Sequence, residues 1–522
     1  MVYRGNGVWR VLETHQEYDV ILFTRIDIGI QDSAIYDSNW GFKSLPREDF
    51  VNSLYVIDSR YLGAYRLRTF LEQFNFKVKV LEYPNNYNYE ELFALLDKFV
   101  TKKTKIIGAN STFGQFNDKL HLVNNFILQC KKRYSHIKWV VGGQNCLTLK
   151  NKLPDADIFV NGFGENALLA ILEDKVDENE TELDGTFGYG FPNEYFTQWK
   201  EEDGIYPEDA LPIETARGCI FACKFCSFPL VGKKKNEHVA TSDDLKRQFL
   251  NNYEKFGVTK YNITEETFND NLFKLENILN ITRDLPFELS LAAFIKPELL
   301  VAKPEMIDML VEMGLEGCSI GTESLNPESR KAVGKGYTYE KIKDALVDLK
   351  KKSHNRGKLG FGIVQNIIIG LPYETKETFA KGVEYLINAY ECDRLVLHIL
   401  NIRKSDDTWT YTSPIDKNPE SFGYEVWESN RLPDSYEWKN NEDLNSTNSR
   451  ELLEKYYKTI FWNNTCHGFY GPINGMRNGL HLPSFYKLQE GKNTKLTKQQ
   501  RDFISRNLNQ RVKDYYNYQL SM

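Results

Sequence analysis

The chain has 522 residues, 41% of them hydrophobic, which suits a large core and predicts roughly two to four domains. Its formal net charge of −6 argues against a broad nucleic-acid-binding surface. No apolar run has the length of a membrane span and no apolar signal core opens the chain, so we expect a soluble cytoplasmic protein. Its 8 cysteines are too few for a disulfide scaffold.

The first part of the chain, residues 1–200, alternates strand-like and helical patterns. This alternation predicts an α/β domain with a doubly wound, Rossmann-like sheet. No G-x-G-x-x-G sequence follows a strand here, which argues against a nicotinamide site. The predicted strands are 18–23, 53–58, 77–83, 104–110, 137–143 and 156–162.

Glycines and small hydroxyl residues follow several of these strands. The order of the segments resembles the cobalamin-binding domain that precedes the barrel in one class of radical S-adenosylmethionine (SAM) enzymes. The stretch D-S-R-Y-L-G stands where some cobalamin proteins have D-x-H-x-x-G, whose histidine ligates cobalt, and Arg60 takes the place of that histidine. A guanidinium has no lone pair for a metal, so a cobalamin bound here would lack a lower histidine ligand. The resemblance implies a cobalamin groove at Arg60, Gly63, Ser111, Thr112, Gly142, Gly143, Gly162 and Gly164.

Three cysteines stand close together after this region. Cys219, Cys223 and Cys226 have the spacing C-x3-C-x2-C, with Phe225 before the last one. Three thiolates can hold three irons of a 4Fe–4S cube and leave the fourth iron open to a small molecule. The alternatives are three buried structural cysteines or a zinc site, for which His238 could be the fourth ligand. The spacing and its aromatic residue resemble the signature of the radical SAM superfamily, which implies that SAM binds the open iron.

Residues 201–403 contain six strand-like runs separated by helical patterns. Such a pattern predicts a parallel sheet with helices outside it. Six units resemble the open, partial (β/α)6 barrel of radical SAM enzymes. The cysteines follow the first run, and chemistry in parallel α/β folds collects at the C-terminal ends of strands. The runs are 211–217, 260–264, 287–294, 317–321, 364–370 and 394–400.

Three further segments follow strands of this barrel, namely T-E-E-T-F-N-D, S-I-G-T-E-S and G-L-P-Y-E-T. They resemble superfamily elements that meet the amino, ribose and adenine groups of SAM. A carboxylate beside the SAM ammonium would gain a charge-assisted hydrogen bond. By composition alone, the same segments could be an exposed acidic loop and ordinary strand ends. The resemblance implies a SAM site at Phe225, Glu265, Glu266, Glu323, Ser324, Ile368, Gly370 and Leu371.

Aromatic and polar residues dominate residues 404–522. Helical patterns at 450–462 and 498–512 predict a mostly helical C-terminal cap over the open barrel. The predicted architecture is therefore a Rossmann-like, cobalamin-binding-like domain, a partial barrel and a helical C-terminal domain.

The resemblance implies an enzyme that cleaves SAM reductively at a 4Fe–4S cluster and makes a 5′-deoxyadenosyl radical. With cobalamin, methyl transfer to an unactivated carbon is the expected outcome. Without it, rearrangement, cyclisation and methylthiolation stay open, although a methylthiotransferase would need a second cysteine triad and a basic tail, and the sequence shows neither. A non-catalytic Fe–S or cobalamin sensor is the other alternative. We expect a small-molecule or peptide substrate and an electron donor such as flavodoxin or ferredoxin, without nucleic acid or membrane.

Overall fold

The structure is a computed structural model, and two compact units emerge from it. One consists of Met1–Pro207, Glu254–Gly257 and Arg501–Met522, and the other of Glu208–Tyr253 and Val258–Gln500. The C-terminal end of the chain therefore belongs with the N-terminal sheet, and the domain boundaries at 200 and 403 stay predictions. The residues described are 17–28, 60–111, 120–143, 146–185, 188–189, 196–207, 209–227, 240–358, 361–404, 412–429, 435–463 and 513–522.

The first unit contains a six-stranded parallel sheet in the order β2-β1-β3-β4-β5-β6. The strand order reverses at β1, and ligands of open α/β sheets bind outside the carboxyl ends of strands at such a switch point. The predicted Rossmann-like fold is thus confirmed, while the run at 53–58 lies outside the described residues. The sequence pattern did not predict β6, which is short and polar. The strands are β1 (Val20–Phe23), β2 (Val78–Leu81), β3 (Ile106–Asn110), β4 (Lys138–Gly142), β5 (Ile158–Asn161) and β6 (Glu182–Asp184).

Helices cover this sheet through apolar faces. In α4, Leu92, Leu95, Leu96 and Phe99 are buried, at the spacing of one helical face. The helix begins after Asn88, whose side chain accepts from the backbone N–H of Glu91 in a capping box. The helices and 3-10 turns are α3 (Leu62–Glu72), η2 (Pro84–Asn86), α4 (Tyr89–Phe99), α5 (Leu120–Arg133), α6 (Cys146–Leu149), η3 (Lys150–Lys152), α7 (Glu165–Leu172) and η4 (Glu201–Asp203).

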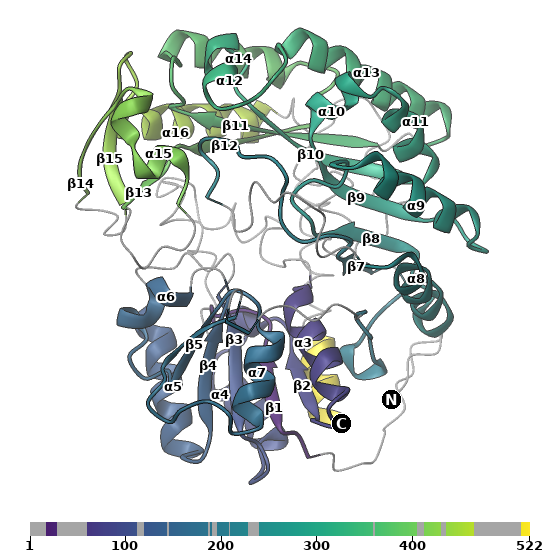
Figure 1. Ribbon diagram of the computed structural model, residues 1–522, viewed down its shortest axis with the longest axis vertical. Helices are drawn as coiled ribbons and strands as arrows, with labels where there is room; N and C mark the ends of the chain where they lie inside the picture. The colour runs from purple at the N-terminus through teal and green to yellow at the C-terminus, as the bar shows by residue number, and fades with distance from the viewer. Residues whose placement is uncertain are drawn as a thin grey trace. The chain divides into compact units, whose positions relative to one another are not determined.

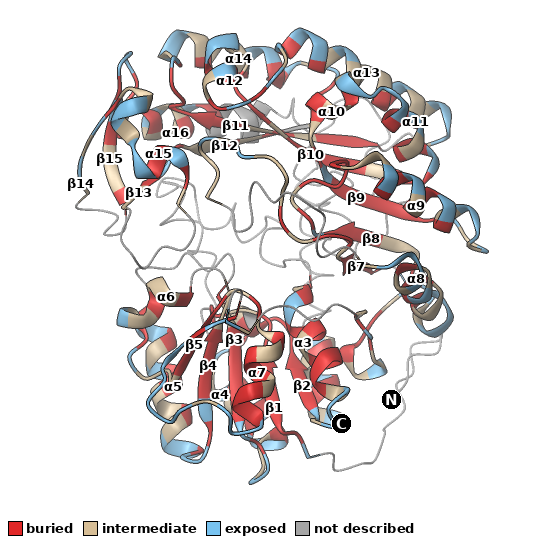
Figure 2. Ribbon diagram, in the orientation of Figure 1, coloured by how far each residue is buried: buried red, intermediate tan, exposed pale blue. Residues whose placement is uncertain are grey.

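The second unit contains the barrel sheet, six parallel strands in the consecutive order β12-β11-β10-β9-β8-β7. Each of the six predicted runs forms a strand, so the prediction of a (β/α)6 arrangement is confirmed. Most residues of these strands are buried (Figure 2), as is typical of parallel sheets covered by helices. The strands are β7 (Ala210–Ile213), β8 (Lys260–Ile263), β9 (Ser290–Ile295), β10 (Leu315–Glu323), β11 (Gly362–Ile369) and β12 (Arg394–Ile399).

The barrel helices lie on the outer side of this sheet (Figure 1). In α13, Ile342, Leu346 and Leu349 are buried toward the strands. The helices are α8 (Ser242–Phe256), α9 (Leu272–Arg283), α10 (Pro297–Ala302), α11 (Glu305–Glu312), α12 (Pro327–Ala332), α13 (Tyr339–Asn355) and α14 (Lys376–Ile387).

The tail contains both helices and a small sheet. The helix predicted at 450–462 is confirmed by α16, whereas 498–512 lies outside the described residues. An antiparallel sheet in the order β13-β15-β14 was not predicted. No helix in the described part of the chain has the length and apolarity needed to cross a membrane. The tail elements are β13 (Ile402–Arg403), α15 (Pro414–Lys417), η5 (Pro419–Phe422), β14 (Tyr424–Glu428), β15 (Ser435–Asn440) and α16 (Ser446–Asn463).

Candidate active site

The cysteine loop follows β7 at the carboxyl edge of the barrel sheet. Cys219, Cys223 and Cys226 are partly exposed and form no disulfide, and Phe225 between them is also partly exposed. The loop is fixed at Lys224, whose N–H donates to Val333 O (3.1 Å) and whose carbonyl accepts from Ile415 N (3.0 Å). The other described cysteines are buried, namely Cys130, Cys146, Cys318 and Cys392.

The three thiols are all partly exposed on one loop. Among the described residues, no three His, Cys, Asp or Glu side chains are placed to hold one metal ion. In a 4Fe–4S cube each thiolate binds its own iron, so the sulfurs need to surround a cluster rather than meet at a point. Three accessible cysteines on one loop fit this demand. The alternative zinc ligand, His238, lies outside the described residues.

A hydroxyl from the next strand reaches the cysteine loop. Thr267 follows β8 and is buried, and its Oγ1 lies 3.5 Å from the Sγ of Cys219. Sequence reasoning singled out the two acidic residues before Thr267 but missed this contact. The T-F dipeptide after the acidic pair was the signal available.

Of the two acidic residues after β8, Glu265 is buried in an ion pair. Lys274 Nζ lies 2.7 Å from Glu265 Oε2 and 2.6 Å from Asp270 Oδ1, and the Thr215 hydroxyl donates to Glu265 Oε1. Burial raises the pKa of Glu265 to about 7, although Lys274 lowers it. Glu266 is partly exposed. The proposed contact of either carboxylate with SAM stays a prediction.

At the end of β10, Glu323 pairs with a buried lysine. Glu323 has a left-handed backbone (φ 65°), and its Oε1 lies 3.3 Å from Lys335 Nζ, which also donates to Gly321 O (2.8 Å). Burial alone would lower the pKa of Lys335, but Glu323 and Glu298 raise it, so the ammonium stays charged. The buried ion pair thus fixes the side chains of Glu323 and Lys335 at the carboxyl edge of the barrel.

Ser324 and Gly370 make structural contacts at the carboxyl edge of the barrel sheet. The Ser324 hydroxyl donates to the Glu374 carboxylate and accepts from Asn326 N (2.9 Å). Gly370 has φ 95°, and a Cβ added there would lie 2.0 Å from Cη2 of Trp438 on β15. Ile368 and Leu371, beside this glycine, are buried. The SAM contacts predicted for these four residues stay predictions.

The predicted cobalamin residues gather at the carboxyl edge of the N-terminal sheet. Ser111, after β3, donates from both N and Oγ to Gly142 O at the end of β4 (2.7 and 2.8 Å). Gly143 and Gly162 follow β4 and β5 with positive φ, which favours glycine. The remaining two lie at helix starts, Gly63 in α3 near Asn110 and Gly164 before α7 against Leu67, and Thr112 lies outside the described residues.

Arg60 lies buried within the same unit. Its guanidinium donates to Asp203 O (2.8 Å), Gly204 O (2.9 Å) and the Tyr65 hydroxyl (3.3 Å). These bonds hold the guanidinium on backbone carbonyls. The interpretation that this position supplies no metal ligand agrees with its chemistry.

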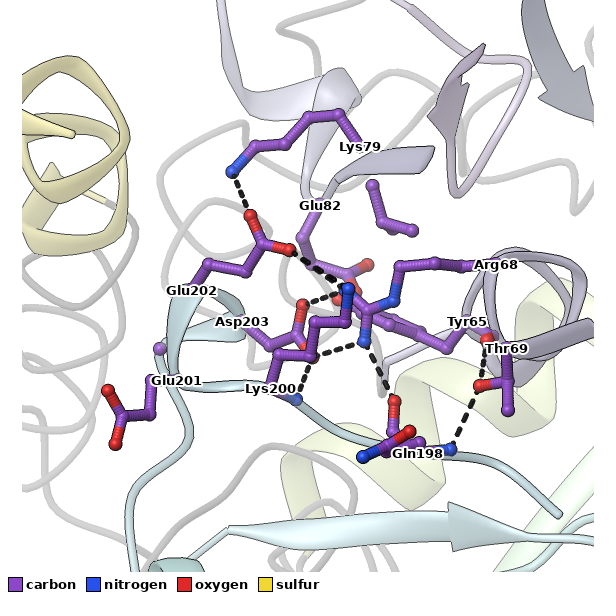
Figure 3. A network of polar contacts seen from close by, with 12 residues as sticks. Tyr65, Arg68, Thr69, Lys79, Glu82, Gln198, Lys200, Glu201, Glu202 and Asp203 are labelled. Atoms are coloured by element: carbon purple, nitrogen blue, oxygen red, sulfur yellow. Dashed lines mark hydrogen bonds and ion pairs between the residues drawn. The ribbon is translucent and has the colours of Figure 1, made fainter. Parts of the chain in front are cut away.

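A second buried network anchors the connector at 198–204 (Figure 3). Arg68 binds both carboxylate oxygens of Asp203 (2.6 and 2.7 Å), and its NH2 also donates to Gln198 O (2.9 Å). Glu202 accepts from Lys79 (3.0 Å). This connector, which leads toward the barrel, is thus bound to α3 and β2.

Comparison with known proteins finds a family match and a partial relative. Residues 213–386 match the family described as the radical SAM superfamily. An uncharacterized methyltransferase of Pyrococcus horikoshii is 26% identical over 184 residues, which are 34% of this chain and 38% of that protein. The match therefore spans well under half of the relative's length.

Two solved structures share the fold of this chain. The radical SAM methyltransferase TsrM from Kitasatospora setae, with tryptophan substrate and a SAM analog bound, has a TM-score of 0.56 at 15% identity, over 79% of each chain. The cobalamin-dependent SAM radical enzyme OxsB, with aqua-cobalamin and SAM bound, has a TM-score of 0.56 at 14% identity, over 97% of this chain and 79% of that chain. The family match covers β8 to β11 and the cysteine loop, while the structural likeness also includes the N-terminal sheet. Residues 213–386 therefore match the radical SAM superfamily, and the chain as a whole shares the fold of TsrM and OxsB.

Proposed function

We propose that this enzyme is a cobalamin-dependent radical SAM methyltransferase that methylates an unactivated carbon of a small-molecule substrate. One observation carries the proposal. Cys219, Cys223 and Cys226 are accessible on one loop at the carboxyl edge of the barrel, while the other described cysteines are buried. Accessible, clustered thiols suit metal binding, whereas buried single thiols act as small apolar residues.

The three cysteines would hold a 4Fe–4S cluster and leave one iron open to the amino and carboxylate groups of SAM. When bound, the cluster supplies the electron that cleaves SAM, and cobalamin supplies a carrier for the methyl group. The Glu323–Lys335 ion pair would border the SAM site at this edge, and Thr267 contributes a hydroxyl beside Cys219. Glu266, Ile368 and Leu371 are proposed to contact SAM.

For cobalamin, we propose the carboxyl edge of the N-terminal sheet. Gly142, Gly143 and Gly162 leave backbone uncovered there, which allows a nucleotide tail to approach closely. The position of Arg60 on backbone carbonyls supports binding without a lower histidine ligand. TsrM and OxsB, which share the fold, have been solved with cobalamin.

The rival assignment to a methylthiotransferase has less support. A second cluster in the N-terminal unit would need a second set of accessible thiols. Cys130 and Cys146 are buried instead, and burial raises the pKa of both thiols, which opposes thiolate formation. A non-catalytic sensor would bind the cofactors without cleaving SAM, so the formation of 5′-deoxyadenosine distinguishes it from an enzyme.

SAM cleavage tests the proposal directly. After anaerobic reconstitution with iron and sulfide and reduction by dithionite, the wild type should form 5′-deoxyadenosine from SAM, measured by liquid chromatography with mass spectrometry. Cys223→Ala should abolish this product because the cluster loses a ligand. Cys318→Ala, which removes a buried core thiol, is the matched control and should retain it. Product formation by Cys223→Ala at the wild-type rate would refute the assignment.

Cobalamin binding and methyl transfer need separate measurements. Reconstitution with hydroxocobalamin followed by gel filtration should leave corrinoid absorbance on the protein, and its absence would remove cobalamin from the proposal. SAM with a deuterated methyl group then labels a methylated product by mass. Flavodoxin or ferredoxin in place of dithionite tests the proposed electron donor.

A further inference from the structure

The cysteine loop is held between two segments that lie far apart in the chain. Lys224, between Cys223 and Cys226, donates its backbone N–H to Val333 O at the end of α12 (3.1 Å). Its carbonyl accepts from the backbone N–H of Ile415 in α15 (3.0 Å). The barrel therefore holds one side of the loop, and a segment from the tail holds the other.

A buried carboxylate fixes the short helix that carries Ile415. Asp416 Oδ2 accepts from Ser413 N (2.8 Å), and Asp416 N donates to Ser413 Oγ (3.0 Å), which closes a capping box at the start of α15. Asp416 Oδ1 accepts from the backbone N–H of Arg403 (2.8 Å) on β13, the strand beside α15 (Figure 1). Ser413, Ile415 and Asp416 are all buried. One side chain thus joins α15 to the antiparallel sheet of the tail.

This antiparallel sheet is itself fastened to the barrel. Its strand β13 pairs with β15. On β15, Trp438 is buried, and its indole Nε1 donates to Leu400 O after β12 (2.8 Å). The Trp438 ring also packs on Gly370 after β11. The tail sheet therefore gives α15, and through it the contact with Lys224, a fixed support on the barrel.

We propose that Asp416 is a positioning residue for the iron–sulfur cluster, because it holds α15 on the loop that carries the cluster ligands. The inference rests on the proposed function, since it takes Cys219, Cys223 and Cys226 as these ligands. Contacts outside the ligand set orient metal ligands, and their loss weakens metal binding. A cluster with an open iron has one protein ligand fewer than a four-cysteine cluster, so its retention depends more strongly on the order of the loop.

Two substitutions that each remove a carboxylate bonded to the backbone test this role. Asp416→Ala removes both acceptors that fix α15, and Asp416→Asn keeps one acceptor oxygen. Asp393→Ala is the matched control. Asp393 accepts from Ile363 N (2.8 Å) and from Lys350 Nζ (2.7 Å) just before β12, at the edge of the barrel sheet opposite the cysteine loop.

The first measurement is the release of iron from the reconstituted full-length protein to a chelator under anaerobic conditions, followed by absorbance. We expect release from Asp416→Ala to be about threefold to tenfold faster than from the wild type, the range that one net hydrogen bond supplies. Asp416→Asn should lie between the two, and Asp393→Ala should match the wild type. Release that is equally fast in Asp393→Ala would overturn the proposal, because it would follow overall stability rather than the contact at the loop.

The second measurement reads the contact without a cluster. Amide hydrogen exchange of the full-length protein before iron is added, followed by mass spectrometry of peptides that contain Ile415, reports the bond to the Lys224 carbonyl. Exchange should be about threefold to tenfold faster in Asp416→Ala and unchanged in Asp393→Ala. Denaturant unfolding checks that each variant is folded, and Asp416→Asn takes over the test if Asp416→Ala does not fold. Wild-type iron release or wild-type exchange in the folded variant would overturn the proposal.

The fate of the proposed function is read separately. If the wild type forms no 5′-deoxyadenosine but iron release and amide exchange both depend on Asp416, the methyltransferase assignment fails and the positioning role stands. If 5′-deoxyadenosine forms and neither measurement depends on Asp416, only the positioning role is rejected.

Discussion

Two buried ion clusters, one in each unit, have similar composition and different surroundings. In the N-terminal unit, Arg68 and Lys79 face the carboxylates of Glu202 and Asp203. In the barrel unit, Lys274 lies between Glu265 and Asp270. All these side chains are buried or nearly so.

Their positions separate a structural cluster from one beside the chemistry. The first binds the connector at 198–204 to α3 and β2. The second directly follows β8, and two residues beyond Glu265 the hydroxyl of Thr267 reaches Cys219. A buried charge alone therefore does not mark a functional site, because ion pairs also fasten scaffolds.

The two clusters also differ in charge balance. Burial would raise the pKa of Glu202, but Lys79 and Arg68 hold it at about 2. In the barrel, one lysine serves two carboxylates, and burial raises the pKa of Glu265 to about 7. Glu202 of the connector cluster is thus ionised near neutral pH, whereas Glu265 of the barrel cluster takes up a proton there.

Breaking the connector cluster should have the largest effect on stability. Asp203→Ala leaves Arg68 buried without its bidentate partner, which should cost about 3–5 kcal/mol of the free energy of unfolding. Denaturant unfolding measures this loss. The double variant Arg68→Met with Asp203→Leu should recover most of it, because no unpaired charge stays buried. A loss well below 1 kcal/mol in Asp203→Ala would show that the pair does not anchor the connector.

Much of the fold was predictable because local patterns determine it. Strand-like runs separated by helical patterns predicted all six barrel strands, and the three cysteines follow the first of these runs. Contacts between distant segments carry no local signal. Tyr515 near the C-terminus packs on Tyr83 of the N-terminal unit (ring centroids 5.6 Å apart), and Trp438 packs on Gly370. The sequence therefore suggested a ligand role for Gly370, where packing already requires a glycine.

The sequence indicated which residues belong to the candidate site, but it did not indicate which residues contact one another. Glu265 and Thr267 lie two residues apart after the same strand, but only the structure shows that one is locked by Lys274 and the other reaches Cys219. Asn366 Oδ1 on β11 likewise lies 3.3 Å from His398 Nε2 on β12, a contact between two strands that neither segment reveals alone.

The pH dependence of stability sharpens the contrast between the clusters. Folding raises the pKa of Glu265 from an ordinary 4.5 to about 7, so the folded state keeps a proton that the unfolded chain releases. Its favourable contribution is therefore present below 4.5 and is lost as pH rises toward 7. From about pH 5 to about pH 8, the wild type should lose about 1–3 kcal/mol relative to Glu265→Gln, which has no such proton.

Unfolding of the two proteins at several pH values measures this difference. Glu202→Gln is the matched control from the other cluster. Because the pKa of Glu202 is held at about 2, its difference from the wild type should stay flat over the same range. A constant gap between the wild type and Glu265→Gln would show that Glu265 is ionised throughout.

The smallest expected effect concerns Thr267, which follows Glu265 in the chain. It tests whether the Thr267 hydroxyl influences the iron–sulfur cluster. The Thr267 hydroxyl lies 3.5 Å from Cys219 Sγ, and a thiolate bound to iron can only accept, so Thr267 would donate. Hydrogen bonds to ligand sulfurs help set cluster potentials, because they stabilise the more negative, reduced state. Thr267→Val keeps the shape and removes the donor, which should lower the reduction potential by about 20–60 mV if one net hydrogen bond is lost.

A redox titration of the reconstituted protein, followed by electron paramagnetic resonance, measures this potential. Thr267→Ser retains a hydroxyl and should stay near the wild type. Thr215→Val removes the hydroxyl that donates to Glu265 instead, and it should leave the potential nearly unchanged. Equal potentials in the wild type and Thr267→Val would mean that this hydroxyl serves packing, as the connector's polar contacts do. A lower reduction potential in Thr267→Val, but not in Thr215→Val, would show that Thr267 interacts with the cluster and that the ion cluster around Glu265 does not.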